Sequence, residues 1–124
     1  MSRRMVWGPT FEEMLHPGKI DPTIREKALA AKEGDPLNEI NLYNITWKRP
    51  DGKPCYIVLP KELTGVDANI IALYGRDFPT GSHKVGATYT VTMEKQLLGE
   101  ITPGEHTLVY PSTGNYGIGG AWVG

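Results

Sequence analysis

The stretch "ANIIALYGRDFPTGSHK", residues 68–84, passes from a short apolar run through a glycine-bearing loop to a lysine. The run at 68–75 is compact and apolar, which predicts a buried β-strand. A helix is predicted over 83–98, and Gly99 marks its end. Lys84 then falls in the first turn of this helix, where the helix dipole disfavours a positive charge. The placement of an ammonium group at this position needs an explanation.

The segments that follow repeat the same order of elements. The apolar run "HTLVYP" at 106–111 predicts a second short strand, and "STGNYGIGGAWVG" at 112–124 predicts a glycine-rich turn that enters another helix. Strands that alternate with helices favour an α/β fold with a parallel sheet and a right-handed crossover. Because loops after parallel strands share one edge, loops 75–84 and 111–116 are expected to face one crevice.

The first part of the chain, residues 1–67, is predicted to be an N-terminal extension of helices and a β-hairpin. A short helix is expected from Thr10, and a second helix is expected after Asp21, which is a suitable N-cap. A hairpin is predicted over 45–59, around the turn "PDG". Residues 68–124 are then the start of a separate α/β domain.

Composition excludes several classes of protein. The 124 residues carry 13 basic and 14 acidic side chains, and a formal net charge of −1 gives no reason to expect nucleic acid or an anionic membrane as a partner. Cys55 is the only cysteine, so neither an intrachain disulfide nor a cysteine-based zinc cluster is expected, and no metal is predicted. The amino end lacks an apolar leader, and no run approaches about 20 apolar residues. We therefore expect a cytoplasmic protein that does not enter a membrane.

Each of the two loops has an ordinary interpretation beside a functional one. Lys84 could be a solvated helix lysine, or a partly buried amine that the helix N-terminus keeps neutral and nucleophilic. The loop at 112–117 could be a tight turn of small residues, or a set of hydroxyl, amide and backbone N–H groups that hold an anion. Its glycines do not have the G-x-G-x-x-G spacing of a dinucleotide site.

Together, "PTGSHK" (79–84) and "STGN" (112–115) resemble the β-family of pyridoxal-phosphate enzymes, fold type II, which includes cysteine synthase and the tryptophan synthase β subunit. In that family a lysine in a Ser-x-Lys context forms the internal aldimine with pyridoxal 5'-phosphate, and an [ST]-[ST]-G-N loop binds the substrate carboxylate. The resemblance implies the N-terminal portion of a parallel-sheet catalytic domain. It implies that Lys84 is the catalytic lysine and binds the cofactor together with His83 and Asn115, of which Asn115 bonds to the ring hydroxyl. It also implies that the substrate carboxylate is bound by Ser112, Thr113, Gly114 and Tyr116.

The resemblance implies a lyase or transferase of amino-acid metabolism. Cysteine synthase-like β-replacement or β-elimination through an aminoacrylate is the preferred reaction, and threonine synthase-like or dehydratase-like chemistry is the alternative. The His-Lys pair is similar to the tryptophan synthase β version, whereas "STGN" is similar to the cysteine synthase version, and Tyr116 stands where a threonine is frequent. A non-catalytic α/β anion-binding module and an interaction subunit are the competing classes.

The chain is expected to need further polypeptide. In the family, a later glycine-rich loop binds the cofactor phosphate and a later Ser or Thr meets the pyridine nitrogen. Neither lies within the 124 residues, and the segment "GIGGAWVG" (117–124) is an uncapped apolar helix. We therefore expect the remainder of the enzyme, as a second chain or a continuing segment, to complete the site, and the assembled enzyme to be a homo-oligomer.

Overall fold

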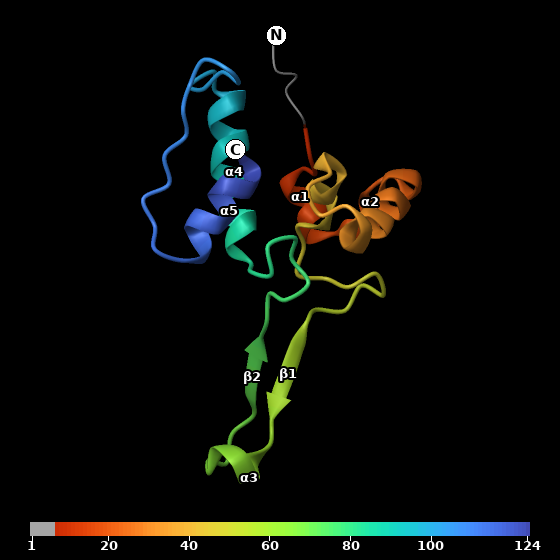
Figure 1. Cartoon of the computed structure of the whole chain (residues 1–124). Helices are drawn as coiled ribbons and strands as arrows, with labels where there is room; N and C mark the ends of the chain where they lie inside the picture. Colours follow the sequence, from red (N-terminus) through yellow and green to blue (C-terminus); the bar gives the residue numbers. More distant parts are fainter. Residues whose placement is uncertain (1–6) are drawn as a thin grey trace.

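A computed structural model describes residues 7–124, which form a small mixed α/β chain (Figure 1). Residues 1–6, part of the segment searched for a leader, lie outside the described residues. Within 7–124 no helix combines the length and apolar character needed to span a membrane. In chain order the elements are α1 (Phe11–Leu15), the 3-10 helix η1 (Pro17–Lys19), α2 (Pro22–Gly34), the 3-10 helix η2 (Glu39–Asn44), β1 (Tyr56–Leu59), α3 (Lys61–Thr64), β2 (Ile70–Leu73), α4 (Lys84–Leu97) and α5 (Asn115–Val123).

The first helices begin where their capping residues predict. Thr10 and Glu13 form a reciprocal capping box at α1, in which the Thr10 hydroxyl accepts from the Glu13 N–H at 3.2 Å. At α2 the Asp21 carboxylate accepts from the Thr23 N–H at 2.8 Å, with proline at the first helical position. These contacts confirm the predicted helices of the N-terminal segment.

Buried amides join α2 to η2. The Asn44 side chain donates to the Ala28 carbonyl at 2.7 Å and to the Asn41 side chain at 3.0 Å. Asn41 in turn donates to the Asp35 carbonyl at 2.8 Å. Because buried polar groups are costly unless they are bonded, this network fixes the two helices against each other.

The sheet corrects the predicted parallel arrangement. Its two strands, β1 and β2, pair antiparallel, with Tyr56 opposite Leu73 and Leu59 opposite Ile70. The connection between them, residues 60–69, is shorter than the crossover that a parallel pair needs. Residues 106–111 are not a strand in the described structure. An apolar run indicates an extended segment but does not identify its partner, which is why the pairing was predicted wrongly.

The predicted hairpin over 45–59 forms only in part. Lys48 and Pro54 make one antiparallel bridge, and the Gly52 N–H donates to the Arg49 carbonyl at 2.9 Å, with Gly52 at φ +78°. The strand that follows this turn pairs with β2 instead. As a result β1 and β2, which lie on opposite sides of the predicted division at 67/68, form one hairpin.

A small core holds the helices together. Ile45, Phe78, Val85 and Tyr89 are buried in contact with one another, and the side chain of Trp122 on α5 packs against this cluster. The Tyr89 hydroxyl donates to the Pro9 carbonyl at 2.8 Å, so α4 is also fastened to the N-terminal segment.

The β1–α3–β2 hairpin, hereafter the arm, projects away from the helices (Figure 1). Neighbouring side chains on its strands are exposed, among them Ile57 at 50% and Val58 at 55% on β1 and Ile71 at 59% on β2. Because successive strand residues point to opposite faces, both faces of the arm are apolar and exposed. An exposed apolar surface of this kind is suited to being covered by further protein.

Candidate functional site

Lys84 is the first residue of α4, as predicted, and its side chain is exposed. Its backbone N–H donates to the Ser82 hydroxyl at 3.3 Å. The partial burial expected for the amine is not observed, because the inward face of the first turns is formed by Val85 and Thr88. The first turn of α4 therefore presents Lys84 to solvent.

His83 precedes the helix and is held by aromatic contacts. Its ring stacks on Trp47, with centroids 5.3 Å apart and planes inclined by 29°. Trp47 meets Phe78 edge to face at 5.0 Å. Phe78 belongs to the core, so this chain of rings anchors the loop before Lys84 to the body of the protein.

Two glycines allow the loop between β2 and α4 to fold tightly. A Cβ atom on Gly75 would lie 2.7 Å from the His83 backbone nitrogen, closer than real Cβ atoms approach. Gly81 adopts φ +69°, and its N–H donates to the Phe78 carbonyl at 2.8 Å. The loop that presents Lys84 thus depends on glycine at both positions.

The second predicted loop, residues 112–115, is exposed at the start of α5. The Ser112 hydroxyl accepts from the Gly114 N–H at 3.2 Å, which leaves the hydroxyl proton free to donate elsewhere. The Gly114 carbonyl accepts from the Gly117 N–H at 3.0 Å. In the described structure no side chain caps the start of α5, where Thr113 and Asn115 flank the N-cap residue Gly114.

Glycines of α5 bring the two loops to the same end of the helix pair. A Cβ atom on Gly119 would lie 2.9 Å from the Thr88 Oγ1 atom and 3.0 Å from the backbone nitrogen of Val85. Asn115 is four residues before Gly119, which is about 6 Å along the helix axis, and Lys84 adjoins Val85. Figure 1 shows that α4 and α5 begin at the same end.

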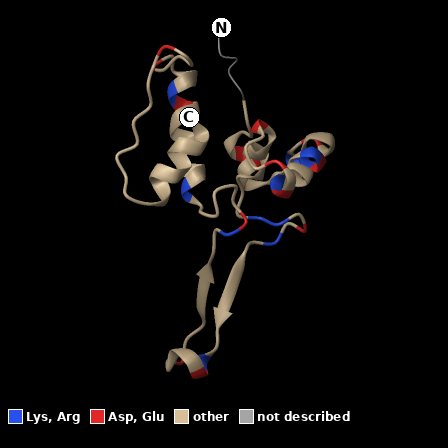
Figure 2. Ribbon diagram, viewed as in Figure 1, with Lys and Arg blue, Asp and Glu red and all other residues tan. Residues whose placement is uncertain are grey.

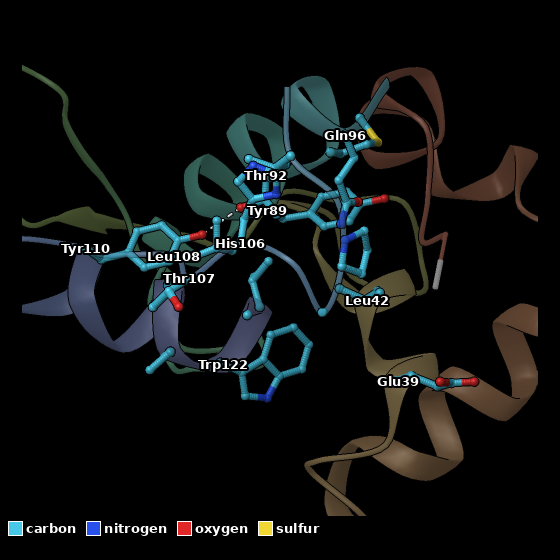
Figure 3. Close-up of a pocket in the computed structure, with 18 of the residues that line it drawn as sticks. Glu39, Leu42, Tyr89, Thr92, Gln96, His106, Thr107, Leu108, Tyr110 and Trp122 are labelled. Carbon is cyan, nitrogen blue, oxygen red and sulfur yellow. Dashed lines mark hydrogen bonds between the residues drawn. The ribbon is translucent and has the colours of Figure 1, made fainter. Parts of the chain in front are cut away.

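Tyr116 lies at the same end but its ring is used in packing. It is half-buried and meets Tyr110 at 5.9 Å between centroids. The Tyr110 hydroxyl is 2.7 Å from the Thr92 hydroxyl (Figure 3). A Cβ atom on Gly120 would lie 2.3 Å from the Tyr110 ring, so this ring fills the space that Gly120 leaves. Sequence reasoning missed Tyr110, Gly119 and Gly120; only the spacing of glycines in "GIGG" pointed to such a contact.

A cavity also lies beside the pair of helices α4 and α5. It has a volume of about 750 Å³ and is enclosed by α4, α5, η2 and residues 101–108 (Figure 3). Tyr89, Thr92 and Trp122 contribute to its wall, whereas Lys84 and Asn115 do not. Gly117, the last residue of the 112–117 loop, also lines the cavity, so it borders that loop but does not include Lys84.

Comparisons of the chain with protein families, curated proteins and solved structures give no match. Residues 7–124 also contain no group of three or more histidine, cysteine, aspartate or glutamate side chains that could hold a metal ion. The assignment of a function therefore depends on the chemistry and arrangement of Lys84 and the 112–115 loop.

Proposed function

We propose that residues 68–124 are the N-terminal portion of the catalytic domain of a pyridoxal-phosphate enzyme of fold type II. The observation that carries this proposal is that α4 and α5 begin at the same end of the helix pair. Lys84 opens α4, the 112–115 loop opens α5, and both lie next to the point where the two helices cross at Gly119. The amine, hydroxyl and amide donors at this end have the chemistry that the aldehyde and ring hydroxyl of the cofactor and a substrate carboxylate require.

The role of Lys84 in the proposal is to hold the cofactor and to move the α-proton of the substrate. Its exposed amine, on the positive end of α4, is available to an aldehyde. His83, which the proposal places at the cofactor, stacks on Trp47. Asn115 supplies an amide for the ring hydroxyl. When bound, the cofactor supplies the electron sink for the reaction.

The substrate carboxylate is assigned to Ser112, Thr113, Gly114 and the first turn of α5, which includes the backbone of Tyr116. Free N–H groups at a helix N-terminus attract an anion, and hydroxyl donors add direction. The Ser112 hydroxyl already accepts a hydrogen bond from the loop, which orients its proton away from Gly114. The substrate class in this proposal, which the family resemblance implies, is an amino acid with a leaving group at its β-carbon.

The reaction preferred in this proposal is replacement or elimination at the β-carbon, as in cysteine synthase. Threonine synthase-like or dehydratase-like chemistry uses the same lysine and the same carboxylate loop, and it is the alternative substrate class. In either case the residues of this chain bind the substrate and move a proton, while the leaving group and the nucleophile depend on contacts to the β-carbon.

The proposal includes a further polypeptide segment that completes the site. Partners for the cofactor phosphate and the pyridine nitrogen are assigned to that segment, because none of residues 7–124 is assigned to either. The exposed apolar faces of the arm, with Val58 and Ile71, give such a segment a surface to cover. The same surface favours the second candidate function, an interaction subunit without catalysis.

The experiment is a trapping reaction on the protein isolated with its native assembly. Pyridoxal phosphate is added, borohydride reduces any covalent adduct, and peptide mass spectrometry locates it. The proposal predicts a visible absorption band and an adduct concentrated on Lys84. Lys84→Ala is expected to remove both, whereas Lys95→Ala, near the other end of α4, keeps them.

An adduct spread evenly over exposed lysines, or one that persists in the Lys84→Ala protein, contradicts the enzyme proposal and favours the interaction subunit. Circular dichroism of both variants shows whether the fold is retained. Because Lys84 is exposed, its replacement is expected to leave the fold intact.

A further inference from the structure

A second, smaller cavity lies between α2 and the segment 44–50. Its volume is about 250 Å³. Four cationic side chains line it, two from α2 and two from the segment, and Asp77 is its one carboxylate; the cations are Arg25, Lys32, Lys48 and Arg49. Figure 2 shows basic residues of the 48–53 loop beneath α2. Such a surplus of positive charge is local, because the whole chain has a formal net charge of −1.

This cavity is hereafter called the basic pocket. Hydrogen bonds hold the side chains at its inner end. The Arg25 Nη1 atom donates to the Tyr43 carbonyl at 2.7 Å and to the Asn44 side chain at 3.1 Å. Both bonds come from one nitrogen, and a guanidinium has five donor protons, so further donors remain on Arg25. Thr46 is buried, and its hydroxyl accepts from the Lys48 N–H at 3.1 Å, which leaves its proton available.

The carboxylate of the pocket is already engaged. Asp77 lies 3.6 Å from the Lys32 ammonium, and it accepts a hydrogen bond from the Cys55 thiol at 3.0 Å. The bond from Cys55, followed by the charge of Lys32, lowers the pKa of Asp77, so this group stays ionised. Asp77 therefore acts on Lys32 and, more weakly, on Arg49, and it is the one carboxylate in the described lining of the pocket against four cations.

We propose that the basic pocket binds a phosphate group, either as inorganic phosphate or on a small phosphate ester. Cations gathered around a partly closed space repel one another unless an anion joins them. A guanidinium, an ammonium and a hydroxyl that converge from different elements suit the tetrahedral oxygens and double charge of phosphate better than a single planar carboxylate. The volume admits a phosphate with a short ester group.

This site is independent of the proposed enzyme function. Its residues come from α2, the 44–50 segment and Asp77, and neither Lys84 nor the 112–115 loop lines it. A binding experiment on the pocket therefore succeeds or fails without reference to pyridoxal phosphate.

The test is isothermal titration of the chain with inorganic phosphate and, separately, with glycerol phosphate at constant ionic strength. We expect one saturable site for at least one of them, and we expect acetate to bind much more weakly. Lys48→Gln should weaken binding by about tenfold, which is the loss of one charge-assisted contact. Lys27→Gln, an exposed lysine on α2 outside the pocket, removes the same charge and should change nothing.

The two anions distinguish the source of the phosphate. Preference for inorganic phosphate identifies a free-anion site, whereas preference for the ester identifies a site for a phosphorylated small molecule, and either supports the proposal. Failure of both anions to saturate, equal weakening by Lys27→Gln and Lys48→Gln, or tighter binding of acetate than of phosphate overturns it. Arg49→Gln, also at an exposed position, provides a second variant if Lys48→Gln does not fold.

Discussion

Replacement of Gly119 by alanine tests the contact that brings the two predicted loops together. The added Cβ atom would lie 3.0 Å from two backbone atoms of Val85 and 2.9 Å from the Thr88 hydroxyl oxygen. Backbone atoms inside a helix do not move aside cheaply, so α5 must shift away from α4. Overpacking of this kind costs about 1–3 kcal/mol, whereas alanine in place of glycine returns at most about 1 kcal/mol of helix propensity.

We therefore expect Gly119→Ala to lower the free energy of unfolding by about 1–2 kcal/mol, which corresponds to a fall in Tm of about 4–8 °C for a chain of this size. Thermal unfolding followed by far-ultraviolet circular dichroism measures the change. Gly34→Ala is the matched control, because Gly34 is also helical but has open space around it. It should raise Tm slightly. If the two variants have equal stability, α5 does not cross α4 in the way described.

Three further predictions concern Tyr89, Tyr110 and Thr113. Burial raises the pKa of Tyr89 to about 12 from about 10 in the unfolded chain, so the stability that its neutral form contributes is complete below pH 10 and is lost between pH 10 and 12. The free energy of unfolding should therefore fall by up to about 3 kcal/mol over this pH range, as measured by urea denaturation at alkaline pH. The fall should be smaller in Tyr89→Phe. Tyr110→Phe removes the hydroxyl contact with Thr92 and should cost about 0.5–1.5 kcal/mol by the same denaturation assay; an unchanged midpoint would exclude the contact. Thr113→Ala should weaken substrate binding in the assembled enzyme by about 1–3 kcal/mol, and unchanged steady-state kinetics would remove this residue from the site.

Local signals in the sequence predicted the helices well. Thr10 and Asp21 cap α1 and α2 with their own side chains, and Gly99, at φ +71°, follows the end of α4. Each signal acts within one turn of the residue that carries it, so no knowledge of the tertiary structure is needed.

The pairing of strands and the burial of the lysine depended on distant residues. β2 pairs with β1, which precedes it, rather than with 106–111, and nothing in the composition of an apolar run selects between these partners. Lys84 is exposed because Val85 and Thr88 occupy the inward face of α4. The nearness of its loop to 112–115 was predicted from a parallel sheet, but in the structure it arises from the close approach of two helices at Gly119.

The arm has a mechanical consequence for the lysine. The ladder of β1 and β2 continues to its base through a hydrogen bond from the Tyr74 N–H to the Cys55 carbonyl at 3.2 Å. The next residue, Gly75, is in close contact with the backbone of His83. The arm is therefore joined to the segment before Lys84 through one ladder hydrogen bond and one close backbone approach. A displacement of the distal end of the arm would be passed on to the residue next to Lys84.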